Sequence, residues 1–234
     1  MKILRSVSRL KQSFIQVIKY FIATFSVAIF AISSARAGSY EDFFLAIRSD
    51  DSPALQALLR RGFDPNTKDP QGRPGLLIAA MTPAWKVAQV LANAPKIQAE
   101  ARNKNDESPL MLAALNNQLD IAKVLIDKDA DVNKPGWAPL HYAASRGHVE
   151  MMALLLDNDA YIDAESPNKT TPLMMAAMYG STSAVKALLE AGADPFLKNE
   201  QGLTAIDFAQ RVNRAEAAGI IAAFIRGKQP KGTW

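Results

Sequence analysis

Short apolar stretches alternate with polar ones along most of this chain, and five of the apolar stretches share one pattern. Each contains a leucine or isoleucine, followed in the first four stretches by an Ala-Ala pair three and four positions later. The five are 73–81 (RPGLLIAAM), 107–115 (ESPLMLAAL), 137–145 (WAPLHYAAS), 170–178 (TTPLMMAAM) and 203–211 (LTAIDFAQR). Apolar and small residues at this spacing are typical of a short helix that packs closely on one side.

A second apolar stretch follows each of these five after a short polar break. The second stretches are 85–94 (WKVAQVLANA), 119–130 (LDIAKVLIDKDA), 149–160 (VEMMALLLDNDA), 183–193 (SAVKALLEAGA) and 215–225 (AEAAGIIAAFI). Their apolar residues recur every three to four positions, which again predicts helices. The chain is therefore expected to form a series of helix pairs joined by polar turns.

The pairs recur at an almost constant interval. Their shared leucine or isoleucine lies at Leu76, Leu110, Leu140, Leu173 and Ile206, with steps of 34, 30, 33 and 33 residues. An incomplete unit precedes them at 40–66. An interval near 33 residues indicates a repeat array, in which each unit buries its apolar face against the next. The step of 30 lacks three residues between Asn133 and Ala138, where Lys134-Pro135-Gly136 is expected to make a compressed turn.

These units resemble the ankyrin repeat, in which a turn is followed by T-P-L-H-x-A-A, then G-H, and then a second helix ending in L-L-x-x-G-A-D-x-N. The matching segments are SPLMLAA, APLHYAASRGHVE and TPLMMAA with LLEAGADP, and the resemblance covers nearly all of residues 40–226. It implies an all-α repeat solenoid of helix-turn-helix units joined by β-hairpin-like turns. About six units are expected, at 40–69, 70–103, 104–134, 135–165, 166–198 and 199–226, followed by a polar tail at 227–234.

Residues with side-chain hydroxyls precede three of the predicted first helices. Ser108, Thr171 and Thr204 are expected to be N-caps, because a hydroxyl can accept a hydrogen bond from an unpaired backbone N–H. In the ankyrin family the threonine and histidine of T-P-L-H usually bond to each other, but no unit here has both, and His141 is preceded by Ala138 at that spacing. The resemblance implies structural roles for both His141 and His148.

The chain opens with a basic region, a short apolar run and small residues. Residues 20–32 (YFIATFSVAIFAI) carry no charge and are followed by Ala35-Arg36-Ala37. This order is typical of a secretory signal peptide over residues 1–37, with cleavage between Ala37 and Gly38. The alternative is an uncleaved membrane anchor, although Lys19 and Arg36 bracket only 16 residues and a membrane span needs about 20.

The net charge of +4 comes from this leader. Residues 1–37 hold six basic residues and no acidic one, so 21 basic residues face 23 acidic ones in the rest of the chain, a net charge of −2. No basic stripe remains to follow a phosphate backbone, so nucleic-acid binding is not expected. The chain has no cysteine and only two histidines, which excludes disulfides, thiol catalysis and a multi-histidine metal site.

No group of residues in the sequence has the pattern of a catalytic site. Carboxylates such as Asp50-Asp51 fit turns and caps. The Gly-Lys at 227–228 lacks the spacing and the following Ser or Thr of a phosphate-binding loop. We therefore expect no enzyme activity, no cofactor and no metal.

Ankyrin arrays bind other proteins with the concave surface formed by their turns and by the exposed side of each first helix. On this sequence that surface gives the candidate partner-binding residues Arg73, Met81, Leu115, Asn116, Trp137, Arg146, Met178 and Tyr179. Met81, Leu115, Met178 and Tyr179 occupy similar places in different units, where they would either form an apolar stripe or tuck into the helix turns. Trp137 lies at the base of the notch left by the compressed turn. There it either lines a partner pocket or packs over the notch for structural reasons.

The most direct interpretation is an exported, non-enzymatic scaffold in a bacterial periplasm that binds a protein partner and is itself a monomer. Some bacterial periplasmic ankyrin proteins are linked to oxidative-stress enzymes and others neutralise toxins as immunity proteins. The sequence does not choose between these processes. The alternatives are a membrane-tethered structural module, if the leader stays uncut, and a secreted effector acting in a host cell.

Overall fold

The computed structural model describes residues 38–228, and within that range it consists of six helix pairs. A helix at 38–48 pairs with α2 (Ser52–Arg60). The following pairs are α3 (Gly75–Met81) with α4 (Trp85–Asn93), α5 (Pro109–Leu115) with α6 (Leu119–Ile126), α7 (Pro139–Arg146) with α8 (Val149–Leu156), α9 (Pro172–Tyr179) with α10 (Thr182–Glu190), and α11 (Ala205–Arg211) with α12 (Ala215–Lys228). The described residues form no sheet beyond one isolated antiparallel bridge between Lys68 and Pro74. The all-α repeat array expected from the sequence is confirmed.

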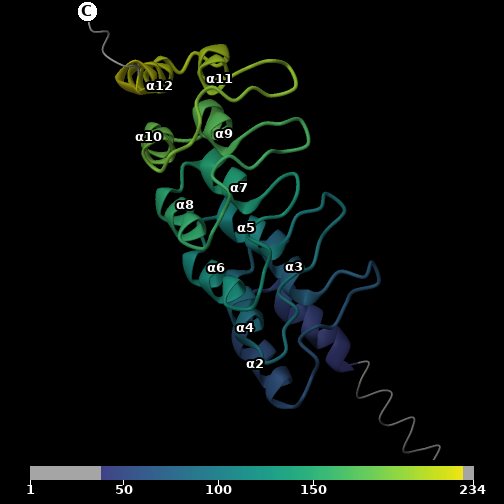
Figure 1. Ribbon diagram of the computed structural model, residues 1–234. Coiled ribbons are helices and arrows are strands. Elements are labelled where there is room, and N and C mark those ends of the chain that lie inside the picture. Colours follow the sequence, from purple (N-terminus) through teal and green to yellow (C-terminus); the bar gives the residue numbers. More distant parts are fainter. Residues whose placement is uncertain (1–37, 229–234) are drawn as a thin grey trace, which may run out of the picture.

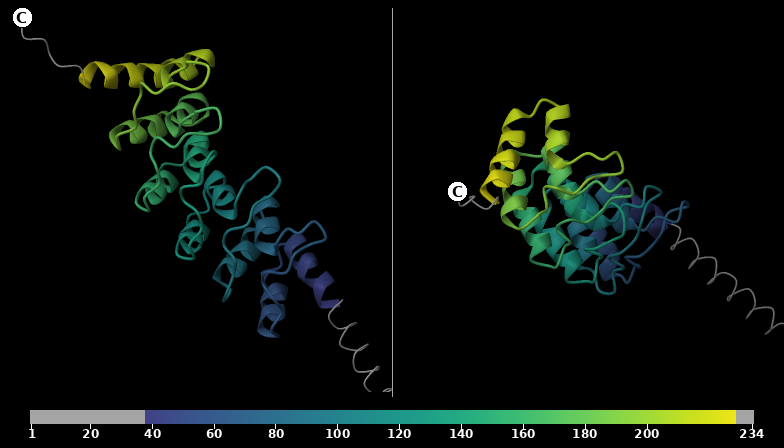
Figure 2. Two further views of the ribbon diagram at one scale, coloured as in Figure 1. Left: turned by 45° about the vertical axis from the view of Figure 1, so that its right-hand side comes forward. Right: turned by 45° about the horizontal axis from the view of Figure 1, so that its top comes forward.

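The helix pairs stack into two columns. The first helices of the pairs (α3, α5, α7, α9 and α11) form an inner column, and the second helices form an outer column on one side of it (Figure 1). Long turns project from the inner column on the opposite side. The main helix contacts lie within a pair or between neighbouring pairs, and Figure 2 shows the same order from two further sides. The two ends of the described chain therefore lie at opposite ends of the stack.

Small residues let the inner helices approach one another. Ala79, Ala113, Ala143 and Ala176 are completely buried where successive inner helices meet. Leucines and isoleucines fill the space between the two columns, and one continuous core runs from Phe43 in the first helix to Ile221 in α12. Because each layer is buried by the next, stability is expected to come from contacts between units as much as from the units themselves.

The helix starts follow the expected capping chemistry with one variation. The Ser108 hydroxyl accepts from the backbone N–H of Met111 (3.3 Å), and the Thr171 hydroxyl accepts from that of Met174 (3.4 Å). Thr204 differs, because its hydroxyl donates to the carboxylate of Asp207 at 2.6 Å. In both cases the first turn is tied to the residue that precedes the helix.

Three of the joints between units are also bridged by the residue that precedes the outer helix. His148 Nε2 donates to the carbonyl of Leu115 (3.1 Å), the Ser181 hydroxyl donates to that of Gly147 (3.4 Å), and Arg214 donates to that of Ala176 (3.2 Å). These bonds cross to the preceding unit. The structural role expected for His148 agrees with this contact.

The expected signal segment and Ala37 lie outside the described residues, and Gly38 begins the first helix. Between residues 38 and 228, no helix has the length and apolar character required to cross a bilayer.

Candidate functional site

Turns that project from the inner column form a row of five tips, and four of them close in the same way. In each, a backbone N–H donates to the carbonyl of the fourth residue beyond it. The pairs are Asp69 with Arg73 (2.9 Å), Asn103 with Glu107 (3.1 Å), Ser166 with Thr170 (3.0 Å) and Asn199 with Leu203 (3.0 Å). A side-chain oxygen of the first residue also accepts from the backbone N–H of that fourth residue. Each of these tips is thus stabilised by hydrogen bonds between its own residues.

The third tip is the short one, and it has no such closing pair. Residues 134–136 make its turn with Gly136 at a φ of +83°, a left-handed conformation that favours glycine. Lys134 folds back into the structure, where it pairs with the carboxylate of Asp106 and donates to the carbonyl of Pro135 (3.1 Å). Only 7% of the Lys134 side chain is exposed. The compressed turn expected from the 30-residue step is therefore present.

An ion-pair network lies beneath this turn. Arg102 contacts the carboxylates of Asp131 (2.7 Å), Glu100 (2.8 Å) and Asp106 (3.6 Å). Burial raises the pKa of Glu100 in spite of the neighbouring guanidinium. The network joins the second tip, at 103–107, to the shortened third one.

Trp137 lines a hollow of about 240 Å³ at the base of the short tip. Its other lining residues are Leu115, His141, Tyr142, Ser145 and Met175, which come from three successive inner helices. The indole is partly exposed and meets the His141 ring edge-on, with 5.3 Å between the ring centres and 75° between the planes. The hollow is open to solvent and lies next to the shortened third tip.

His141 forms part of the hollow's wall and is held in its neutral form. Its Nδ1 accepts from the backbone N–H of Ala138 (3.1 Å), and its Nε2 donates to the carbonyl of Thr170 (2.9 Å). Burial lowers the pKa of His141 to about 4. Both ring nitrogens have backbone partners, which agrees with the structural role expected for His141.

Tyr142 connects the hollow to the second tip. Its hydroxyl donates to Glu107 Oε1 at 3.1 Å, and the Ser145 hydroxyl donates to the carbonyl of Tyr142 at 2.8 Å. Burial, together with the negative charge of Glu107, raises the pKa of the Tyr142 hydroxyl. The hollow is thus an apolar surface whose own hydroxyl and imidazole groups are already hydrogen-bonded.

The structure brings together some of the residues proposed from the sequence. Leu115 and Trp137 share the hollow, and Arg146 is exposed one residue beyond Ser145. Asn116 is exposed at the end of α5, with its amide nitrogen donating to the carbonyl of Leu112 (2.8 Å).

The other proposed residues lie outside the hollow's lining. Met178 and Tyr179 end α9, and the Tyr179 side chain is 60% exposed. Met81 ends α3 and is 39% exposed, while Arg73 pairs with Asp69 within its own tip at 2.6 Å.

Tyr142, Met175 and Glu107 were not among the residues proposed for the site. Tyr142 and Met175 both lie two residues after the shared leucine of their units, a position that faces the concave surface. This repeated position was the feature of the sequence from which both residues could have been assigned to the site. Glu107 precedes the first helix of its unit, at a position expected on the concave surface, but its contact with Tyr142 was not predictable because the two residues are 35 apart in the sequence.

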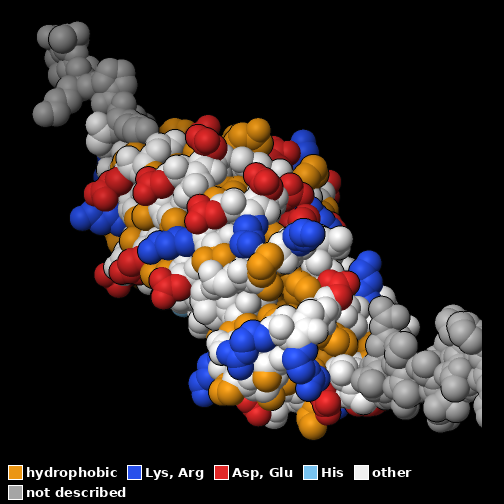
Figure 3. Space-filling view, turned by 90° about the horizontal axis from the view of Figure 1, so that it is seen from below, with side chains coloured by type: hydrophobic (Ala, Val, Ile, Leu, Met, Phe, Trp, Pro, Cys, Tyr) orange, Lys and Arg blue, Asp and Glu red, His pale blue; other side chains and the backbone are white. Residues whose placement is uncertain are grey.

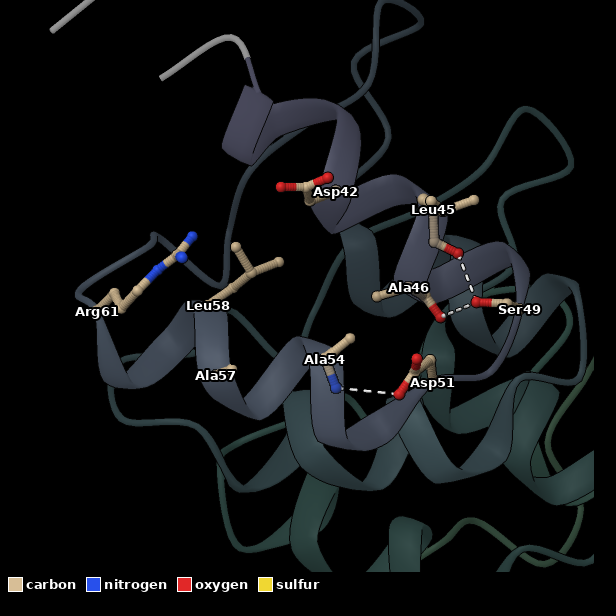
Figure 4. A pocket seen from close by; sticks show the side chains of 9 residues that line it. All are labelled: Asp42, Leu45, Ala46, Ser49, Asp51, Ala54, Ala57, Leu58 and Arg61. Atoms are coloured by element: carbon tan, nitrogen blue, oxygen red, sulfur yellow. Dashed lines mark hydrogen bonds between the residues drawn. The ribbon is translucent and has the colours of Figure 1, made fainter. Parts of the chain in front are cut away.

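A second groove lies between the first helix and α2 at the N-terminal end of the stack. It has a volume of about 530 Å³ and contains Leu45, which is 56% exposed. Figure 4 shows Arg61 at one end of this groove and Asp51 at the other, with small alanines between them. Seen from below, acidic and basic side chains are interspersed with hydrophobic ones on this face (Figure 3). The groove has no set of residues with a recognisable chemical task.

Residues 38–228 hold no group of three or more histidine, aspartate or glutamate side chains placed to bind a metal ion. The geometry thus offers an apolar hollow on a repeat array. The family model described as ankyrin repeats in three copies matches residues 43–136, 87–166 and 133–199. The chain belongs to the ankyrin repeat family. Ankyrin repeat domains are generally protein-binding scaffolds and are typically non-catalytic.

Similar proteins come from very different sources. Alpha-latrocrustotoxin-Lt1a of Latrodectus tredecimguttatus is 41% identical over 91 residues, which are 39% of this chain and 6% of the toxin. The putative ankyrin repeat protein YahD of Escherichia coli is 26% identical over 195 residues, covering 78% of this chain and 94% of YahD. A crystal structure of an ankyrin repeat domain from Acinetobacter baumannii superposes with a TM-score of 0.67 at 24% identity, covering 78% of this chain and 96% of that domain. The structural likeness shows the fold, and YahD is a bacterial protein of similar sequence.

Proposed function

We propose that this protein is an exported, non-enzymatic scaffold that binds a partner protein through its concave surface, centred on Trp137. The observation that carries the proposal is the open apolar hollow at the shortened tip. Solenoid proteins of this kind use extended concave surfaces for binding. Tryptophan is enriched among the residues that dominate protein interfaces.

The size and chemistry of the hollow favour a protein partner over a small molecule. Sites for small molecules typically have volumes of about 300–1,000 Å³ and a few free polar groups that orient the ligand. This hollow has about 240 Å³. Its histidine and both of its hydroxyls are bonded within the protein. A single side chain presented by a larger surface is a better fit to such a site.

Trp137→Ala is expected to weaken partner binding by more than tenfold, about 1.4 kcal/mol, while the thermal stability changes little. The indole is partly exposed, so its removal should take away surface that a partner could contact and should affect the packing of the core little. Titration calorimetry with the purified partner and thermal unfolding of the free protein would measure both quantities. Tyr161→Ala is the control, since Tyr161 is 68% exposed and lies outside the hollow. A large drop in melting temperature with unchanged affinity would identify Trp137 as a structural plug.

The partner itself can be found by affinity capture from the native cell envelope followed by mass spectrometry. Captures with the wild-type protein and with Trp137→Ala should be run in parallel. A partner of the concave surface is expected with the wild type and depleted with the variant. A protein captured equally by both binds elsewhere on the array, which would argue against the Trp137 site.

Export to the periplasm is the second element of the proposal, and it is supported by the basic region, the apolar run and the Ala35-Arg36-Ala37 segment. Mass measurement of the protein recovered from the cell envelope is expected to give a chain that starts at Gly38. A full-length chain in the membrane fraction would instead support the anchored alternative, in which the same array is tethered at the membrane surface.

A further inference from the structure

Glu107 stands beside the Trp137 hollow as a carboxylate bonded only to neutral donors. Its Oε1 accepts from the Tyr142 hydroxyl (3.1 Å) and its Oε2 accepts from the amide of Asn103 (2.7 Å). Among residues 38–228, no lysine, arginine or histidine forms an ion pair with it. Glu107 is partly buried, so water screens its charge less than it would on an open surface.

The other charged or titratable groups near the hollow are paired, neutral or exposed. Asp106, next to Glu107, pairs with Lys134 and lies 3.6 Å from Arg102. His141 has a pKa lowered to about 4 by burial, so it adds no positive charge at neutral pH. Arg146 follows Ser145 at the other end of α7, but it is exposed, where a charge contributes little to binding. Glu107 is therefore a partly buried negative charge beside the hollow that has no cationic partner among residues 38–228.

The interior of the hollow is suited to an apolar group. Leu115, Trp137 and Met175 supply hydrophobic surface from three neighbouring units. A cavity of about 150 Å³ lined by apolar side chains can hold a benzene molecule, so 240 Å³ is sufficient for a leucine, methionine or phenylalanine side chain. Tyr142 belongs to both features, because its ring lines the hollow and its hydroxyl bonds Glu107.

We propose that the hollow receives a short segment of the partner protein that carries one apolar side chain next to a lysine or arginine. The apolar side chain fills the hollow against Trp137 and Met175, and the cation pairs with Glu107. The charge complementarity at Glu107 selects a basic neighbour over an acidic one. This inference rests on the proposed function, since it specifies what the partner presents to the same site.

Blocked dipeptides test the idea without knowledge of the partner. The probes are acetyl-Leu-Arg methylamide, acetyl-Leu-Glu methylamide and acetyl-Gly-Arg methylamide, with the first two also made in reversed order. Binding to the protein is followed by NMR at the Trp137 indole N–H and at the Met175 methyl group, which are easily assigned because the chain has 3 tryptophans and 8 methionines. We expect saturable shifts of both signals with the Leu-Arg probe in at least one order. The Leu-Glu probes should bind at least fivefold more weakly, and the Gly-Arg probe should leave Met175 unchanged.

Glu107→Gln is the matched variant, since it removes the charge and keeps the shape. It should bring the affinities for the Leu-Arg and Leu-Glu probes within twofold of each other and leave the shift of Met175 in place. Glu150→Gln on the outer helix α8 is the control and should keep the wild-type preference. The comparison of probes on the wild-type protein stands even if Glu107→Gln folds poorly. Equal or tighter binding of Leu-Glu by the wild type would overturn the proposal.

The outcomes separate this inference from the proposed function. If Trp137→Ala abolishes partner binding but the probes show no charge preference, the scaffold site stands and the basic neighbour is wrong. If the probes behave as expected but a captured partner binds Trp137→Ala normally, the hollow has the stated chemistry and that partner uses another surface.

Discussion

Gly180→Ala is expected to destabilise the protein by about 3 kcal/mol, at the upper end of what overpacking usually costs. Gly180 follows α9 and faces the neighbouring inner helix α7. A Cβ added there would press against the carbonyl oxygen of Ala144 and lie 2.9 Å from the Cα of Ala176. Both neighbours are backbone atoms, so they cannot rotate away as a side-chain tip could. The two inner helices would have to separate where the fourth and fifth units meet.

Gly219→Ala is the matched control, and it should change the free energy of unfolding in the opposite direction. Gly219 lies inside α12, and a Cβ there would have no heavy atom within 4 Å. Alanine is favoured over glycine in an exposed helix by about 1 kcal/mol, so this variant should be slightly more stable than the wild type. Urea unfolding followed by circular dichroism measures both changes. Equal effects of the two substitutions would show that helix α7 can move to make room at Gly180.

Acid is expected to weaken the array through His141, by about 3 kcal/mol between pH 6.5 and pH 4. The pKa of this buried imidazole is about 4 in the folded protein, below its ordinary value of 6.5. The unfolded chain therefore binds a proton in this window while the folded protein does not. The stabilisation is complete above pH 6.5 and is lost as the pH falls towards 4. Free energies of unfolding measured across this range would show the slope.

His141→Met is the variant that isolates this effect, because methionines already occupy the same position in two neighbouring units. Met111 and Met174 accept from the backbone N–H of their N-cap residues through sulfur, each at 3.4 Å. The variant loses the bond to Thr170, so it should be less stable at pH 7, but its stability should no longer depend on this titration. The difference between the two pH curves is the contribution of His141. Parallel curves would mean that another group causes the acid sensitivity.

The repeat pattern was enough to predict the architecture. Leu110, Leu140 and Leu173 set the period, and the Ala-Ala pairs indicated where inner helices would meet. These features were readable because each one depends on residues a few positions apart within a unit, and because it recurs. The compressed turn at 134–136 was also predictable, since a change in an otherwise regular interval locates the missing residues.

The chemistry of the hollow could not be predicted in the same way. The hydrogen bond between Tyr142 and Glu107 joins adjacent units, and no spacing of residues within one unit predicts it. Lys134 is another example, since a lysine in a turn is ordinarily solvated, whereas here it is buried and paired with Asp106. Such contacts depend on how far the units rotate when they stack, which the repeat interval does not specify.

The way the tips are closed has a consequence for the evolution of this protein. Four tips are tied by bonds between residues four positions apart within the same tip, while α5, α7 and α9 keep their packing next to the short third tip. A deletion or insertion in one tip therefore leaves the helical layers intact, as is usual for exposed loops on a rigid scaffold. The length of one tip can thus differ from that of the others without loss of the stack, as it does in the turn before Trp137.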